Sequence, residues 1–347
     1  MKQIDKGALI TLLRTVSEGF ETKSKIRLYS MGGTALTFLG LKQSTVDVDF
    51  LLEKEDDLRE LRSAIMYARP SELGPVRFSP PRKNGISVSF PKAGLRIDLY
   101  IGRVENVILS PNMIDRSKNL ESINWIELRT LSIADLLLLK VTAGRPKDLE
   151  DVRAMGPTPE DWSVMVNELL WQLRNSPSPR KLLYSILDSL SRWNYELPAP
   201  KRLFDVIAEL CSISKPKKLV FIFSKASPAE RTIRPLELLN KLRGMGIKVE
   251  MIDITGMPES QRFNLYMELA GLVAMKRKYE VRRVFGSRKN PGYLFGGMVP
   301  ALVVYYNNKM PADVYPHKSQ LRGVSILKPV DFLEILLAML EKEKREE

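Results

Sequence analysis

The sequence predicts an α/β protein, because segments typical of strands and segments typical of helices alternate along its 347 residues. Residues 85–90 and 95–100 alternate apolar with polar side chains, as half-buried strands do. Residues 10–20 and 235–243 carry apolar side chains at helical spacing. A chain of this length forms two or three domains, and we expect three regions of different organisation.

The first region, residues 1–125, is predicted to be a mixed sheet covered by helices. Residues two apart on a strand share a face, so Val46, Val48 and Phe50 are expected to face the core. The predicted elements are, in chain order, a helix over 10–20, a strand over 26–29, a short helix over 34–40, a strand over 46–50 and a hairpin of strands over 85–90 and 95–100.

The second region, residues 126–213, is predicted to be helical, and the third, residues 218–345, to be a further α/β unit. Amphipathic patterns over 162–170 and 182–190 indicate two helices of the second region. The uninterrupted apolar run 219–223 is typical of a strand covered on both faces. The third region is further predicted to contain helices over 235–243, 265–278 and 330–342 and strands over 248–254 and 299–306.

The composition narrows the classes of function. One cysteine, Cys211, and one histidine, His317, exclude a disulfide framework or a Cys/His zinc site within one chain and argue against Ser–His and Cys–His hydrolase schemes. No apolar run reaches the length of a membrane span, so we expect a soluble cytoplasmic protein without a membrane partner. The formal net charge of +13 favours an anionic partner such as nucleic acid, although such charge is also common on ordinary solvated surfaces.

A glycine pair followed by two alternating acids is the most informative pattern of the first region. Gly32 and Gly33 open the predicted short helix, where backbone N–H groups can approach a phosphate, and Thr34 adds a hydroxyl there. Asp47 and Asp49 project from one face of the next strand, where two carboxylates repel each other unless cations lie between them. Such hard oxygen ligands suit Mg²⁺. Singly, each feature is a common turn or strand edge; their order and spacing indicate a site for a metal-bound triphosphate.

A third acid, Asp98, is expected on the strand over 95–100, where it shares a face with Arg96 and Tyr100. We expect this strand to lie near the one that carries the first two acids. Three carboxylates on neighbouring strands beside a phosphate-binding turn predict a two-metal site for phosphoryl transfer.

A second motif lies in residues 140–151, where a glycine and then a proline suit the end of one helix and the start of the next. The resulting bend can aim Lys140 at the triphosphate, while Asp148 and Asp151 face one way on the second helix. The alternative is equally consistent with the sequence: Lys140, Arg145 and Asp148 form an ion-pair network that ties two helices to the sheet. Arg145 is expected to be structural in either case.

Together these motifs resemble the nucleotidyltransferase superfamily built on the DNA polymerase β-type fold. Residues 32–36 (GGTAL), residues 47–50 (DVDF) and Asp98 match the superfamily pattern. Residues 140–151 are similar to the K-x-x-x-G-R-x-K-D-x-x-D pattern of the AbiEii-like group of minimal nucleotidyltransferases. The resemblance covers roughly residues 1–160. It implies a nucleotidyltransferase fold and an enzyme that moves a nucleoside monophosphate from an NTP to a hydroxyl.

The resemblance also implies a role for each candidate residue. Asp47, Asp49 and Asp98 hold Mg²⁺ or Mn²⁺, and Asp98 assists deprotonation of the acceptor hydroxyl. Gln43 is a departure, since related sequences carry Arg there and the neighbouring Lys42 cannot copy the two-pronged contact of Arg. The residues implied in binding the NTP are Gly32, Gly33, Thr34, Lys140 and Asp148.

The partners implied by the resemblance are an RNA and a second protein. In the AbiEii-like group the acceptor is often the 3′ end of tRNA, and the enzyme is the toxin of a prokaryotic toxin–antitoxin pair. This implies tRNA or another RNA as acceptor and an antitoxin as protein partner. A protein or small-molecule acceptor is left open by the residues themselves.

The third region resembles the thioredoxin fold in the order of its elements and in the place of Pro300 before a strand. Residues 227–230 occupy the place of the C-x-x-C site and contain no cysteine, which excludes thiol–disulfide exchange. The resemblance therefore implies a docking domain for a partner. The basic residues within 276–289, interleaved with Tyr279 and Phe285, either bind RNA through phosphates and stacking or form a charged outer helix face.

Two hypotheses of function result. In the first, the protein is a metal-dependent nucleotidyltransferase. In the second, it is a non-catalytic adaptor that retains a nucleotide pocket and docks a protein or RNA partner through residues 218–345. The altered Gln43 and the large third region favour the second hypothesis somewhat, whereas the complete set of acids favours the first.

Overall fold

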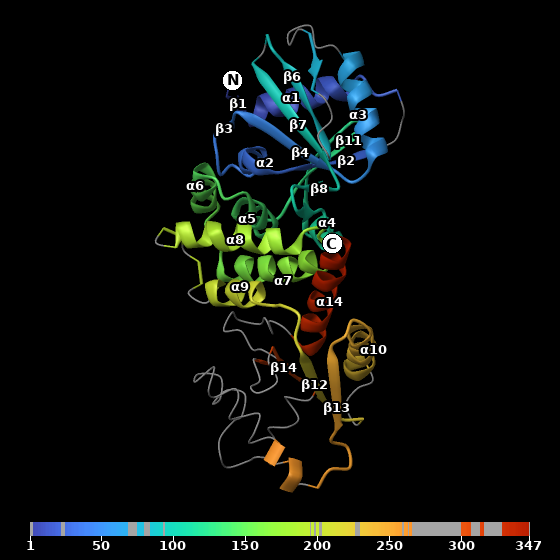
Figure 1. Cartoon of the computed structure of the whole chain (residues 1–347). Helices are drawn as coiled ribbons and strands as arrows, with labels where there is room; N and C mark the ends of the chain where they lie inside the picture. The colour runs from blue at the N-terminus through green and yellow to red at the C-terminus, as the bar shows by residue number, and fades with distance from the viewer. Residues whose placement is uncertain are drawn as a thin grey trace. The chain divides into compact units, whose positions relative to one another are not determined.

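The computed structural model separates into two compact units, residues 1–204 and 205–347, and each is described by itself (Figure 1). The chain combines a seven-stranded mixed sheet with many helices, so the predicted α/β class is confirmed. The residues that the structure describes are 3–21, 25–68, 75–79, 84–92, 94–194, 196–197, 199–200, 203–225, 230–258, 260–262, 264–265, 300–306, 313–315 and 328–346.

The first unit is built on the seven-stranded sheet. From one edge to the other its strands are β10 (Lys118–Ile123), β11 (Ile126–Thr130), β2 (Ile26–Ser30), β4 (Asp47–Leu52), β7 (Leu95–Ile101), β6 (Gly85–Phe90) and β5 (Arg77–Phe78). β4 is antiparallel to β2 and parallel to β7, which forms the predicted hairpin with β6. The two acid-bearing strands, β4 and β7, are therefore direct neighbours.

Two helices, α1 (Lys6–Ser17) and α3 (Glu55–Ala68), share one hydrophobic core with the sheet. Val48 and Phe50 are buried in this core as predicted. The prediction for Val46 is wrong: this residue precedes β4 in a bend and keeps 36% of its surface exposed. The alternation of a strand gives no information about a residue that lies just before the strand begins.

The first unit also contains short elements that the sequence did not indicate. β8 (Arg103–Val104) and β9 (Val107–Ile108) form a small hairpin after β7, and α4 (Pro111–Arg116) follows it. β1 (Ile4–Asp5) and β3 (Ser44–Thr45) form a separate two-stranded pair. The predicted short helix is confirmed as α2 (Gly32–Phe38), which begins two residues earlier than expected.

Four helices complete the first unit after the sheet: α5 (Ile133–Ala143), α6 (Pro146–Met155), α7 (Pro159–Asn175) and α8 (Pro179–Trp193). α5 packs against each of the other three. Gly144 ends α5 in the left-handed conformation, with φ of 63°, and Pro146 opens α6. This turn reverses the chain so that the first turn of α6 lies beside the last turn of α5.

The second unit is organised around a four-stranded sheet with the order β13-β12-β14-β15, in which β12 and β13 are parallel and the other pairs antiparallel. Leu219, Val220, Phe221 and Ile222 are all buried, so the predicted strand covered on both faces is confirmed. Its elements are β12 (Lys218–Phe223), α10 (Glu230–Gly244), β13 (Lys248–Asp253), β14 (Ala301–Tyr305), β15 (Asp313–Tyr315) and α14 (Pro329–Glu346); α9 (Leu203–Cys211) precedes them.

The thioredoxin-like identity of this unit stays a prediction. Residues 227–229, His317, the basic residues within 276–289 and all but the first residue of the helix predicted over 265–278 lie outside the described part of the chain. Within the described part, no helix is both long and apolar enough to cross a membrane.

Candidate active site

A cavity of about 610 Å³ opens where the acid-bearing strands meet α2, α5 and α6. The structure brings six of the eight predicted site residues to its walls, whereas Thr34 and Asp148 do not line it. The six are Gly32, Gly33, Asp47, Asp49, Asp98 and Lys140.

The three acids lie close together because β4 and β7 are parallel and in register. Asp49 is directly opposite Asp98 in this register, and Asp47 is opposite Arg96. Burial, and then the negative charges of Asp98 and Asp47, raise the pKa of Asp49 to about 6. This cluster therefore concentrates negative charge on hard oxygen atoms inside a cavity, which is the donor chemistry that suits a divalent cation such as Mg²⁺.

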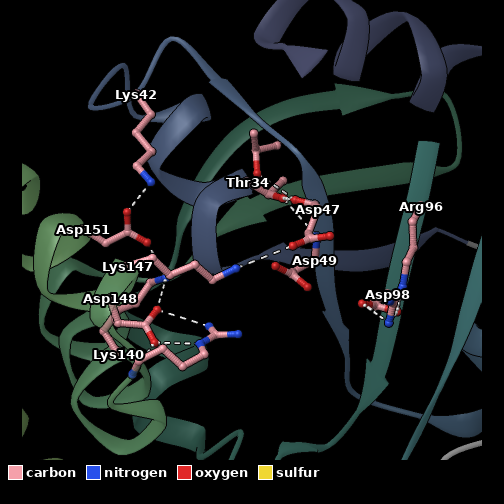
Figure 2. Close-up of polar contacts among 12 residues, drawn as sticks. Thr34, Lys42, Asp47, Asp49, Arg96, Asp98, Lys140, Lys147, Asp148 and Asp151 are labelled. Carbon is pink, nitrogen blue, oxygen red and sulfur yellow. Dashed lines mark hydrogen bonds and ion pairs between the residues drawn. The ribbon is translucent and has the colours of Figure 1, made fainter. Parts of the chain in front are cut away.

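Asp98 is held by its neighbours on the sheet. Arg96 donates hydrogen bonds to Asp98 Oδ1 from Nε at 3.1 Å and from Nη2 at 3.0 Å (Figure 2). The Ser87 hydroxyl donates to the same oxygen. Within the described residues, no three Asp, Glu, His or Cys side chains converge into a complete metal site. Arg96 Nη2 also lies 2.9 Å from Asp98 Oδ2, so both oxygens of Asp98 have a partner on the sheet. A cation would be held by Asp47 and Asp49, with Asp98 beside them.

The glycine turn at the start of α2 is shaped to fit the acids. Gly32 has a φ of 59°, and a Cβ atom there would lie 2.8 Å from Asp49 Oδ2. Thr34 is fully buried: its hydroxyl donates to the Asp47 carbonyl oxygen at 3.2 Å and accepts from the Asp49 N–H at 2.9 Å. Thr34 thus ties α2 to β4 and positions the acids, whereas Gly32 and Gly33 line the cavity.

We expect Gly32→Ala to lower the stability by about 1–2 kcal/mol, because an L-residue at positive φ is strained, and also to impair the function of the cavity by displacing Asp49. Gly40→Ala is the matched control, since Gly40 has a φ of 74° and a Cβ atom there would meet no such neighbour within 4 Å. Both variants should lose similar stability in denaturant melts, and only Gly32→Ala should lose activity through displacement of Asp49. Equal activity of the two variants would show that the close approach to Asp49 is unimportant.

The second motif forms an ion-pair network inside the protein. Lys140, which is 4% exposed, contacts Asp148 at 2.8 Å and Asp151 at 2.5 Å. Arg145 contacts Asp148 at 2.8 Å, and Lys42 pairs with Asp151 (Figure 2). Burial raises the pKa of Asp148, but hydrogen bonds from Arg145 and Lys140 outweigh it and hold that pKa below its ordinary value. The network fixes the start of α6 against the end of α5.

Two cations of this motif lie at the cavity with largely exposed side chains. The Lys147 side chain reaches across the cavity to Asp47, with 3.6 Å between Nζ and Oδ2 (Figure 2). Arg145 also lines the cavity, and its side chain is 56% exposed although it was expected to be structural. No role for Lys147 was predicted from the sequence. The lysine at this place in the K-x-x-x-G-R-x-K-D pattern could have indicated one.

Carboxylates on neighbouring strands, beside a glycine turn and exposed cations, form the arrangement of a nucleotidyltransferase. Residues 7–172 match the model of the family described as "Nucleotidyltransferase of unknown function (DUF6036)". This match assigns residues 7–172, the part of the chain that carries the cavity, to a nucleotidyltransferase family, and that family in general implies an NTP substrate and a divalent metal ion. No curated protein and no solved structure matched the chain.

Proposed function

We propose that this protein uses a divalent cation, Mg²⁺ or Mn²⁺, to transfer a nucleoside monophosphate from an NTP to a hydroxyl group. The observation that supports this most strongly is the register of Asp49 with Asp98 in a cavity that Lys147 and Arg145 also line. Negative charge on the strands suits the cation, and positive charge on α6 suits the triphosphate.

In this proposal the chain's own residues bind and orient the reactants. Gly32 and Gly33 present backbone N–H groups to the triphosphate, and Lys147 turns from Asp47 to the phosphates. Asp47, Asp49 and Asp98 hold the cation, which supplies charge neutralisation and orientation of the phosphates when bound. Lys140 and Asp148 act through the network that sets the position of Arg145 and Lys147.

The reaction breaks one phosphoanhydride bond and forms one phosphoester bond. The acceptor oxygen forms a bond to the α-phosphorus, the bond from that phosphorus to the β-phosphate oxygen breaks, and pyrophosphate leaves. The proton of the acceptor hydroxyl passes to the Asp98 carboxylate, which lies beside Asp49 on the side of the cavity away from α6. This proposal includes an RNA acceptor such as the 3′ end of tRNA. It also includes an AbiEii-like toxin role with an antitoxin partner, and docking of a partner through residues 218–345.

Transfer of label from an NTP labelled in its α-phosphate tests the proposal. Wild-type protein with Mg²⁺ or Mn²⁺ is expected to label an acceptor in total RNA, and Asp47→Ala/Asp49→Ala is expected to label none. If the wild type binds NTP but transfers nothing to RNA, protein or small molecules, the adaptor hypothesis replaces this one. If it binds no NTP, both hypotheses fail.

A further inference from the structure

A second cavity of about 450 Å³ adjoins the first one at Asp98. Asp98, Tyr100 and Glu105 line both cavities, so the two share a wall at the acid proposed to accept the proton. The second cavity extends away from this wall to the start of β6, the β8–β9 hairpin and the first turn of α8. A molecule bound there would reach Asp98 from a different cavity than the one proposed for the triphosphate.

The β8–β9 hairpin that separates the two cavities is fixed in place. The Gln172 amide donates to the Ile108 carbonyl oxygen at 2.7 Å and accepts from the Ile108 N–H at 2.9 Å. The Ser176 hydroxyl donates to the Asn106 carbonyl oxygen at 3.1 Å. Glu105, at the tip of this hairpin, has a φ of 51°, which is unusual for a residue other than glycine. A positive φ at a central position is what a two-residue hairpin turn requires, so the loop between β8 and β9 is tight.

The second cavity is lined by two cationic side chains that form no ion pair with a carboxylate among the described residues. Arg103 donates to the neutral Asn84 Oδ1 at 2.9 Å, and Lys181 is exposed in the first turn of α8. Among the described residues neither forms a salt bridge with a carboxylate. By contrast, Asp98 is already paired with Arg96. The remaining polar wall contains one further acid, Glu105, and neutral groups that include Ser87 and Ser178.

We propose that this second cavity binds the acceptor, and that the acceptor is an alcohol that carries a phosphate group. Its hydroxyl would lie at Ser87 and Asp98, and its phosphate at Arg103 and Lys181. A volume of about 450 Å³ falls in the range of small-molecule sites and accommodates one nucleotide. The proposal rests on the transfer reaction proposed above and adds the place and chemistry of the acceptor. Two sources share this chemistry, the 3′-terminal residues of an RNA and a small phosphorylated alcohol.

Binding without turnover tests the proposal. Three probes, the dinucleotide pApA, ribose 5-phosphate and adenosine, are titrated by calorimetry with and without a non-hydrolysable NTP and Ca²⁺. Wild-type protein is expected to bind a phosphorylated probe more tightly than adenosine. The double variant Arg103→Gln/Lys181→Gln should bind that probe about tenfold more weakly, because charged hydrogen bonds to the phosphate are lost. The control Lys118→Gln removes an exposed lysine of β10 that lines neither cavity, and should bind as the wild type does.

The remaining outcomes separate this proposal from the transfer reaction itself. Tight binding of pApA alone identifies an RNA end, and equal binding of ribose 5-phosphate identifies a small phosphorylated alcohol. The proposal is overturned if the double variant binds these probes as the wild type does, or if label passes to protein hydroxyls without RNA. NTP affinity should stay within about twofold of the wild type in the double variant, since the triphosphate cavity is unchanged. Absence of NTP binding in the wild type would instead contradict the transfer reaction.

Discussion

Asp49→Asn is expected to abolish nucleotidyl transfer and yet to stabilise the metal-free protein. The carboxylate would hold the cation in our proposal, and an amide oxygen cannot replace its charge, so we expect a loss of about a thousandfold or more in transfer. The same charge is unfavourable without metal, because it is buried and faces Asp98 and Asp47. Removing it should raise the free energy of unfolding by about 3 kcal/mol at pH 7.5, given the size of the pKa shift.

The direction of the expected stability change follows from the pH dependence of Asp49. The pKa of Asp49 is raised to about 6 in the folded protein, so the folded state binds this proton more tightly than the unfolded chain does. The contribution of Asp49 to the free energy of unfolding is fully present below the pKa that Asp49 has in the unfolded chain. This contribution is lost as the pH rises through about 6, the pKa in the folded protein. The advantage of Asp49→Asn should therefore be largest above pH 6 and shrink towards pH 4.

Urea unfolding of EDTA-treated protein at pH 5.0 and pH 7.5 measures this effect. Asp115→Asn, a change of an exposed acid in α4, is the control and should alter stability by no more than about 0.5 kcal/mol at either pH. A variant Asp49→Asn that is less stable than the wild type at pH 7.5 would mean that the carboxylate is satisfied without a cation. Activity retained by the same variant would remove Asp49 from the metal site.

The site residues that the sequence could predict are those whose direction depends on local periodicity. Asp47 and Asp49 share a face because they are two apart on one strand, and Asp98 follows the same rule on another. The pairing of β4 with β7, which brings Asp98 beside Asp49, is a long-range contact that the spacing alone did not show. We expected it because three acids beside a phosphate-binding turn suit one site, and the resemblance to a known superfamily agreed with that expectation.

The placement of a residue was predicted less well where its side chain can bond to either of two neighbours. The Thr34 hydroxyl bonds the backbone of β4 instead of facing the cavity, and Asp148 is fully buried between Lys140 and Arg145. Their sequence positions are compatible with either direction. The second cavity was not predicted at all, because its walls come from segments far apart in the chain, and Arg103 and Lys181 belong to no motif.

Replacing Lys140 and replacing Lys147 are expected to change the protein's stability by very different amounts. This difference decides between the two interpretations of the second motif. Lys140→Met leaves Asp148 and Asp151 buried with one partner fewer each, so we expect a loss of about 3 kcal/mol or more of stability. Lys147→Gln removes a 57% exposed side chain whose pair with Asp47 spans 3.6 Å, and should cost no more than about 0.5 kcal/mol.

For NTP affinity we expect the reverse order, with the larger loss in the Lys147 variant. Lys147→Gln is expected to weaken NTP binding about tenfold, because a charged contact to phosphate is lost from a well-folded protein. Lys140→Met/Asp151→Asn removes a cation and a carboxylate together, so it should recover part of the lost stability and retain most of the NTP affinity. Urea unfolding and calorimetric titration with NTP and Ca²⁺ measure both quantities. If Lys140→Met is as stable as the wild type but binds NTP poorly, Lys140 contacts the triphosphate directly. The buried network would then be a resting arrangement that opens when the nucleotide binds.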